Sequence, residues 1–233
     1  RTPSYSRAVC DAEPIIDVAR RGNKPGTESG SLRGTRMEVF DMIRVLFVCL
    51  GNICRSPLAE GVFRKLVADR GLSDRIDVDS AGTGGWHAGE PPDRRMRATA
   101  ESRGVSLDGI RARQVKAADL AEFDYVFAMD RENLRDLRAI AARTNDQTLP
   151  GRVDESHLIR ENDNSPQLFR TFDPVKGDPD VPDPYYGGSD GFTRVFEIVD
   201  RTSRSIIDHI CREEGLASDD AASNREGGGR APA

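Results

Sequence analysis

The sequence has few of the features that mark membrane, secreted or metal-binding proteins. No apolar run approaches the length needed to cross a bilayer, and the first residues lack the hydrophobic core of a signal peptide. Only four cysteines and three histidines occur among 233 residues, and their spacing matches neither a disulfide framework nor a metal site. Two of these cysteines, Cys49 and Cys54, lie in one short loop, which fits a reducing compartment. We therefore expect a cytoplasmic protein that does not contact membranes.

The chain also has no excess of positive charge, with 34 lysines and arginines against 39 aspartates and glutamates. The formal net charge is −5 and the isoelectric point is about 5.4, which argues against nucleic acid as a partner. The glycine-containing loop that follows the first apolar run lacks the Gly-Lys-Ser/Thr of nucleotide hydrolases, which excludes that class for this loop. No internal repeat is visible.

The two ends of the chain differ in composition from its middle. Residues 1–41 mix glycine, proline, serine and charges of both signs, and residues 217–233 are rich in alanine, serine, aspartate and glycine. Neither segment carries enough apolar residues for a core, so we predict a disordered N-terminal extension and a disordered C-terminal tail. Residues 42–216 should then form one domain, with a polar insertion at about 144–166 to which we assign no function.

Apolar runs alternate with amphipathic segments through this middle region. Predicted strands cover 43–48, 75–81, 123–129 and, more briefly, 167–170, and predicted helices cover 57–69, 91–104, the segment after Asp130 and 191–211. This alternation predicts an α/β fold, a single domain with a four-stranded parallel, doubly wound sheet flanked by helices. In such folds ligands bind at the loops that follow the strands, which directs attention to the loop after the first strand.

That loop carries the chemistry. Cys49 ends the first strand, and Arg55 follows six positions later beside Ser56 and Pro57. Loop amides at a helix N-terminus bind tetrahedral oxyanions, and an arginine can hold two phosphate oxygens at once. The same positive field favours the thiolate of Cys49, a nucleophile directed at a bound phosphorus. The spacing therefore predicts a phosphate loop with a cysteine nucleophile.

A proline-rich acidic segment, 173–188, precedes the last helix. Prolines on both sides hold Asp183 at a defined position, where its carboxyl could protonate a leaving oxygen and later activate water. Tyr185 and Tyr186 could form the walls of a slot for a flat ring. Asp180 competes for the acid role, and the residues alone do not choose between Asp180 and Asp183.

Taken together, these motifs resemble the low-molecular-weight protein tyrosine phosphatase family, bacterial type. The resemblance is carried by the stretch from Val48 to Pro57 and by Asp183-Pro184-Tyr185-Tyr186. Further matches occur in the family's order and extend the resemblance over about 42–216: Asp79 to Thr83, Trp86, Pro92-Asp93, Ala112 to Gln114, and Met129 to Leu134.

The resemblance implies a role for each matched position. Cys49 would be the nucleophile, Arg55 the phosphate clamp and Asp183 the general acid and base. Leu50, Gly51, Asn52, Ile53, Cys54 and Ser56 would form the phosphate-binding loop, with Trp86, Tyr185 and Tyr186 at the rim of the pocket. Cys54 would also be the redox partner of Cys49. The resemblance further implies no metal or cofactor, tyrosine-phosphorylated proteins as partners, and binding of phosphate or other oxyanions. The chain can bury an adequate core by itself, so we expect a monomer.

Alternative functions remain. An arsenate reductase shares this fold and loop, but it would need further redox cysteines in the middle of the chain, and none lies between Cys54 and Cys211. A catalytically silent phosphotyrosine-binding module is a second alternative, although Cys49, Arg55 and Asp183 are all present. Arginine-phosphatase relatives favour threonine where this chain has Ile53, and the more apolar side chain suits an aryl phosphate.

Overall fold

The computed structural model describes residues 42–146, 165–185 and 188–216. The predicted disordered segments 1–41 and 217–233, most of the predicted insertion, and Tyr186 lie outside these ranges. The predicted domain boundaries therefore stay predictions.

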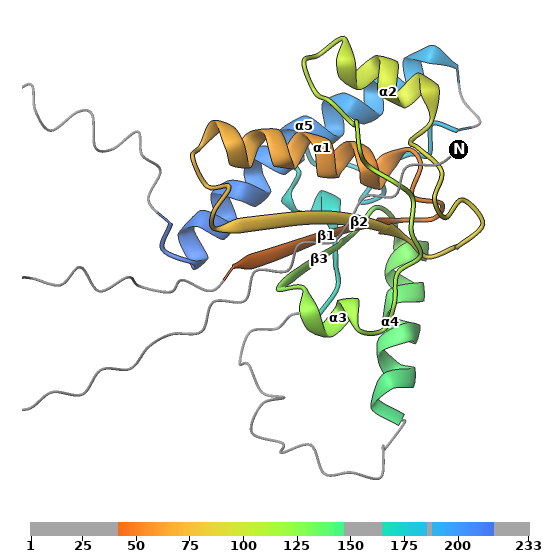
Figure 1. Ribbon diagram of the computed structural model, residues 1–233, viewed down its shortest axis with the longest axis vertical. Helices are drawn as coiled ribbons and strands as arrows, with labels where there is room; N and C mark the ends of the chain where they lie inside the picture. The colour runs from red at the N-terminus through yellow and green to blue at the C-terminus, as the bar shows by residue number, and fades with distance from the viewer. Residues whose placement is uncertain (1–41, 147–164, 186–187, 217–233) are drawn as a thin grey trace, which may run out of the picture. The chain divides into compact units, whose positions relative to one another are not determined.

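Four parallel strands form one sheet in the order β2-β1-β3-β4 (Figure 1). Their bounds are β1 Ile43–Cys49, β2 Ile76–Gly82, β3 Tyr125–Ala128 and β4 Gln167–Leu168. β1 pairs with β2 from Ile43 opposite Ile76 to Cys49 opposite Gly82, and with β3 on its other side. The predicted parallel, doubly wound sheet is confirmed, with the phosphate loop at the carboxyl end of its central strand β1.

Alternate residues of β1 face two separate apolar clusters, as the period of a strand requires. Val45, Phe47 and Cys49 belong to a cluster shared with helices α1 (Arg55–Asp69) and α5 (Ser189–Glu213). Leu46 and Val48 belong to a second cluster, shared with α4 (Arg131–Asp146). Helices therefore cover both faces of the sheet (Figure 1), which explains why β1 is apolar at nearly every position.

Several element boundaries differ from the prediction. α1 begins at Arg55 rather than at Pro57, which leaves Pro57 inside the first turn, where no hydrogen bond is lost. α2 (Arg94–Glu101) begins after Asp93, whose carboxylate accepts the backbone N–H groups of Arg95 and Met96 at 2.7 and 3.4 Å.

The remaining differences lie in the second half of the chain. α4 extends to Asp146, into the start of the predicted polar insertion. The predicted fourth strand is only two residues long, because a 3-10 helix begins at Phe169 and ends at Phe172. The four-residue helix α3 (Asp119–Glu122) is too short for a periodic signal and was not predicted. None of the described helices is long and apolar enough to cross a membrane.

Candidate active site

The phosphate loop, residues 50–54, turns sharply between β1 and α1. Asn52 adopts a positive φ of 54°, a left-handed conformation that asparagine tolerates better than most residues. This turn directs the backbone N–H of Asn52 to the sulfur of Cys49 at 3.3 Å. The hydroxyl of Ser56, in the first turn of α1, lies 3.0 Å from the same sulfur. Two polar groups thus contact the sulfur of a buried cysteine.

The side chain of Asn52 holds the loop in this shape. Its amide nitrogen donates to the hydroxyls of Ser56 and Ser80 at 2.9 and 2.8 Å, and its oxygen accepts the backbone N–H of Arg113 at 2.8 Å. Ser80 in turn donates to the buried carboxyl of Glu60. Burial raises the pKa of Glu60, although its bonds with Ser80 and Arg64 act in the opposite direction. The loop conformation therefore rests on a buried polar network that extends from β2 to α1.

The segment after β2 supports the loop from outside. Thr83 and Gly84 donate backbone N–H groups to the carbonyls of Cys49 and Leu50, both at 2.9 Å. A Cβ at Gly82 would lie 2.8 Å from the carbonyl oxygen of Leu50. Glycine at the end of β2 is therefore required for this close approach of the two backbones.

Arg55 is almost fully buried, with 4% of its surface exposed, and is held by groups from two other segments. Its Nη1 donates to the carboxylate of Asp130 and, at 3.2 Å, to the carbonyl of Val181. Its Nη2 donates to Asp183 at 3.0 Å. Burial alone would lower the pKa of Arg55, but Cys49, Asp183 and Asp130 together raise it, so the guanidinium stays charged.

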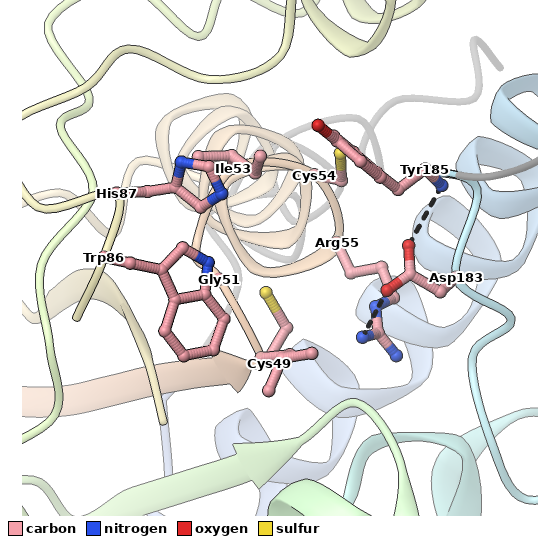
Figure 2. A pocket seen from close by; sticks show the side chains of 10 residues that line it. Cys49, Gly51, Ile53, Cys54, Arg55, Trp86, His87, Asp183 and Tyr185 are labelled. Atoms are coloured by element: carbon pink, nitrogen blue, oxygen red, sulfur yellow. Dashed lines mark hydrogen bonds and ion pairs between the residues drawn. The ribbon is translucent and has the colours of Figure 1, made fainter. Parts of the chain in front are cut away.

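These groups surround a pocket of about 200 Å³. In Figure 2 the sulfur of Cys49 lies between Trp86 and His87 on one side and Arg55 and Asp183 on the other. The residues that line the pocket are Cys49, Leu50, Gly51, Ile53, Cys54, Arg55, Trp86, His87, Asp183 and Tyr185. Among the residues that the structure describes, no group of three histidine, cysteine, aspartate or glutamate side chains could hold a metal ion.

Two predicted rim residues, Trp86 and Tyr185, and the loop residue Leu50 are partly exposed. Trp86, Tyr185 and Leu50 expose 63%, 40% and 40% of their surfaces at the mouth of the pocket. The guanidinium of Arg95 lies over the ring of Tyr185, 5.4 Å from its centroid. These apolar walls leave a slot suited to a flat group.

The structure separates the two aspartates between which the sequence alone did not choose. Asp183 lines the pocket and accepts a hydrogen bond from Arg55. Asp180 is not among the residues that line the pocket and accepts hydrogen bonds from Arg131 instead. Cys54 is buried beside Cys49 in the loop, and desolvation together with the charges of Asp93 and Cys49 raises its pKa well above the ordinary value of a thiol.

Sequence reasoning missed three residues of the site. Asp130 was named only as the residue before a predicted helix and within a matched segment, although its position two residues after the end of β3 places it at the same edge of the sheet as the phosphate loop. Ser80 and Glu60 gave no local signal, because their role depends on packing between β2 and α1. His87, the neighbour of Trp86, also lies in the pocket wall, where its ring packs near Gly51.

Comparisons with known proteins agree with this geometry. A profile of the family described as low molecular weight phosphotyrosine protein phosphatase matches residues 44–150. The low molecular weight protein-tyrosine-phosphatase YfkJ of Bacillus subtilis is 41% identical over 175 residues, which cover 75% of this chain and all of the relative. The chain belongs to this family.

Solved structures of family members support the same conclusion. The crystal structure of YfkJ superposes with a TM-score of 0.63 at 40% identity, over 75% of this chain and 98% of that one. A Drosophila arginine phosphatase superposes with a TM-score of 0.61 at 32% identity, over 72% and 98%. The predicted family and enzyme class, a protein-tyrosine-phosphatase of low molecular weight, are confirmed, and the arsenate reductase alternative is not favoured.

Proposed function

We propose that the chain hydrolyses phosphotyrosine in proteins through a phosphocysteine intermediate on Cys49. One observation carries the proposal: the buried sulfur of Cys49 lies in the same pocket as a buried, charged arginine and the carboxyl group of Asp183, which contacts that arginine. The contacts of Ser56 and Asn52 to the sulfur support its role as a thiolate.

In the first step Arg55 holds two oxygens of the phosphoryl group and directs the phosphorus toward Cys49. The thiolate forms a bond to phosphorus while the bond to the tyrosine oxygen breaks, and Asp183 gives its proton to that oxygen. The free phenol then leaves the slot.

In the second step water attacks the phosphorus of the intermediate. The carboxylate of Asp183 takes a proton from the water, the phosphorus–sulfur bond breaks, and phosphate leaves. Cys49 returns as a thiolate, stabilised by Ser56 and the N–H of Asn52. Leu50, Gly51, Ile53 and Cys54 complete the phosphate loop around the anion.

The walls of the pocket support an aryl substrate. Trp86 and Tyr185 lie on opposite sides of the opening, and Ile53 adds an apolar contact inside it (Figure 2). Arginine phosphate is the second candidate, because a Drosophila arginine phosphatase shares the fold. Tyrosine-phosphorylated proteins are thus the proposed partners, and residues 42–216 are the proposed catalytic domain, working in the cytoplasm, where Cys49 and Cys54 stay reduced.

The test measures hydrolysis of p-nitrophenyl phosphate at mildly acidic pH in EDTA, with and without dithiothreitol, for the wild type and Cys49→Ser. We expect thiol-dependent activity that the variant loses, while phosphate or vanadate still binds to the variant. The rates at which the wild type hydrolyses phosphotyrosine and phosphoarginine peptides are then compared at equal peptide concentration. No activity in the fully reduced wild type, or activity retained in Cys49→Ser, would contradict the proposal.

A further inference from the structure

The backbone just before Asp183 is attached to the first residue of α4. The carboxylate of Asp180 accepts the backbone N–H of Arg131 at 2.9 Å, and it also accepts Nε and Nη2 of the same residue at 3.1 and 2.9 Å. Asp178 lies at 3.5 Å from Nη2 and accepts the backbone N–H of Asp180 at 3.1 Å. One arginine therefore holds this segment through a two-nitrogen fork and its own backbone.

The other side of the same backbone is fixed as well. Arg170 donates from Nη1 to the carbonyl of Asp180 at 3.0 Å, and the N–H of Val181 donates to the carbonyl of Met129 at 2.8 Å. The carbonyl of Val181 accepts from Arg55. Pro182 has a fixed φ and restricts Val181, and Pro184 restricts Asp183. The position of Asp183 therefore follows from where Asp180 and Val181 are held.

Among the contacts that hold this backbone, the one to Arg131 is the most exposed to solvent. Arg131 exposes 62% of its side chain, and an exposed ion pair contributes little to folding stability. Asp180 nevertheless meets α4 at its N-terminus, where a carboxylate is favoured by the helix dipole. The hydrogen bond and charge of Asp180 also raise the pKa of Arg131, as expected for a formed pair.

We infer that Arg131 and Asp180 are a positioning pair for the general acid, holding Asp183 where it reaches the oxygen of the leaving group. Two adjacent residues at the N-terminal end of α4, Asp130 and Arg131, therefore both position groups of the site. Asp130 holds Arg55, and Arg131 holds the segment that carries Asp183. This inference rests on the proposed phosphatase function, since it assigns a role in proton transfer to the leaving group.

The test compares two aryl phosphates that differ in their need for an acid. Phenyl phosphate has a poor leaving group and p-nitrophenyl phosphate a good one, and kcat/KM reports the step in which that group departs. For Arg131→Ala we expect a loss of about 10-fold with phenyl phosphate and less than about 2-fold with p-nitrophenyl phosphate. Asp180→Asn should give the same pattern, and Arg131→Lys, which keeps the charge but not the fork, should recover part of the loss.

Arg135→Ala is the matched control, because Arg135 is an exposed arginine one turn further along α4 that pairs with Glu132. It should keep wild-type kcat/KM on both substrates. In an Asp183→Ala background, Arg131→Ala should cause no further loss beyond about 2-fold, because the group that it positions is absent.

The outcomes separate this inference from the proposed function. Equal losses on both substrates, no loss at all, or a further loss of about 10-fold in the Asp183→Ala background would overturn the positioning role. Each of these results presupposes a wild type that hydrolyses both substrates through Cys49. A wild type that hydrolyses neither would instead overturn the proposed function, and with it the inference.

Discussion

The guanidinium of Arg55 and the carboxylate of Asp183 form an ion pair on one side of the pocket, with Nη2 and Oδ2 3.0 Å apart. The proposed phosphate clamp and the proposed acid are therefore in contact before any substrate binds. A phosphoryl group that binds to Arg55 must share or replace this contact. Asp130 keeps the guanidinium in place on its other nitrogen while that exchange occurs.

Asp130→Asn tests this support of Arg55. The variant keeps an oxygen to accept the N–H of Asn133, so the start of α4 should survive, but it removes the charge that faces Arg55. We expect kcat/KM for aryl phosphates to fall about 10- to 100-fold, because small displacements of a positioning group are costly. The inhibition constant of phosphate should rise in parallel.

Glu132→Gln serves as the control for Asp130→Asn, since Glu132 is exposed in the same helix turn and pairs only with Arg135 among the contacts of the described residues. Its kinetic constants should stay at wild-type values. An Asp130→Asn enzyme with unchanged phosphate inhibition would show that Arg55 does not depend on this contact.

The sequence predicted the sheet and the phosphate loop because both depend on local signals. Apolar runs define β1 and β3, and the interval from Cys49 to Arg55 lies within one loop. The partners of Arg55 were harder to predict, because Asp130 and Val181 lie 75 and 126 positions away. Such contacts depend on how β3 and the proline-rich acidic segment meet at one edge of the sheet. No local pattern in the sequence encodes that meeting.

The choice between Asp180 and Asp183 shows the same limit. Both aspartates are followed within two residues by proline, so local geometry treats them alike. Long-range contacts such as the hydrogen bond from the N–H of Val181 to the carbonyl of Met129 place Asp183 on Arg55 and Asp180 on Arg131. The resemblance to the family indicated the acid, but it gave no reason for the choice.

Trp86 is the only tryptophan in the chain, and it lines the pocket. Its fluorescence should therefore change when vanadate or phosphate fills the site, with the same concentration dependence as enzyme inhibition. A Cβ at Gly84 would lie 1.9 Å from the indole ring, so Gly84→Ala should displace it. We expect an altered emission spectrum and a KM for aryl phosphates raised several-fold, with phosphate inhibition unchanged.

Gly188→Ala is the matched control for Gly84→Ala, because a Cβ at Gly188 meets nothing within 4 Å. Its emission and KM should match those of the wild type. If Gly84→Ala also leaves both quantities unchanged, the indole does not form the substrate wall.

Cys54 should protect the enzyme against peroxide. Hydrogen peroxide oxidises the Cys49 thiolate to a sulfenic acid, and the Cys54 sulfur then displaces water to form a disulfide, which dithiothreitol reduces. We expect Cys54→Ser to lose activity to peroxide without recovery in dithiothreitol. Cys211→Ser should recover like the wild type, since Cys211 lies on α5 outside the residues that line the pocket.

The rate at which the disulfide between Cys49 and Cys54 forms should depend on pH. Burial raises the pKa of Cys54, so only a small fraction of the thiol is ionised near neutrality, and that fraction grows about 10-fold with each pH unit. Disulfide formation after a peroxide pulse should accelerate accordingly. Full recovery of Cys54→Ser in dithiothreitol would remove Cys54 from the redox role.

Glu60 gives a prediction on stability. Burial raises its pKa in the folded protein above the ordinary value of 4.5, so the folded state holds the proton more tightly than the unfolded chain. The stability gained from this group is present at low pH and is lost as the pH rises from about 4.5 through the raised pKa.

The variant Glu60→Gln tests this effect, because it cannot ionise, yet it can still accept the hydrogen bond from Ser80. The melting temperature of Glu60→Gln should therefore rise relative to that of the wild type as the pH increases from 4.5 to 7. The control Glu122→Gln, at an exposed site on α3, should show no such pH-dependent difference from the wild type. A gap between Glu60→Gln and the wild type that does not change with pH would mean that Glu60 does not contribute to stability through its proton.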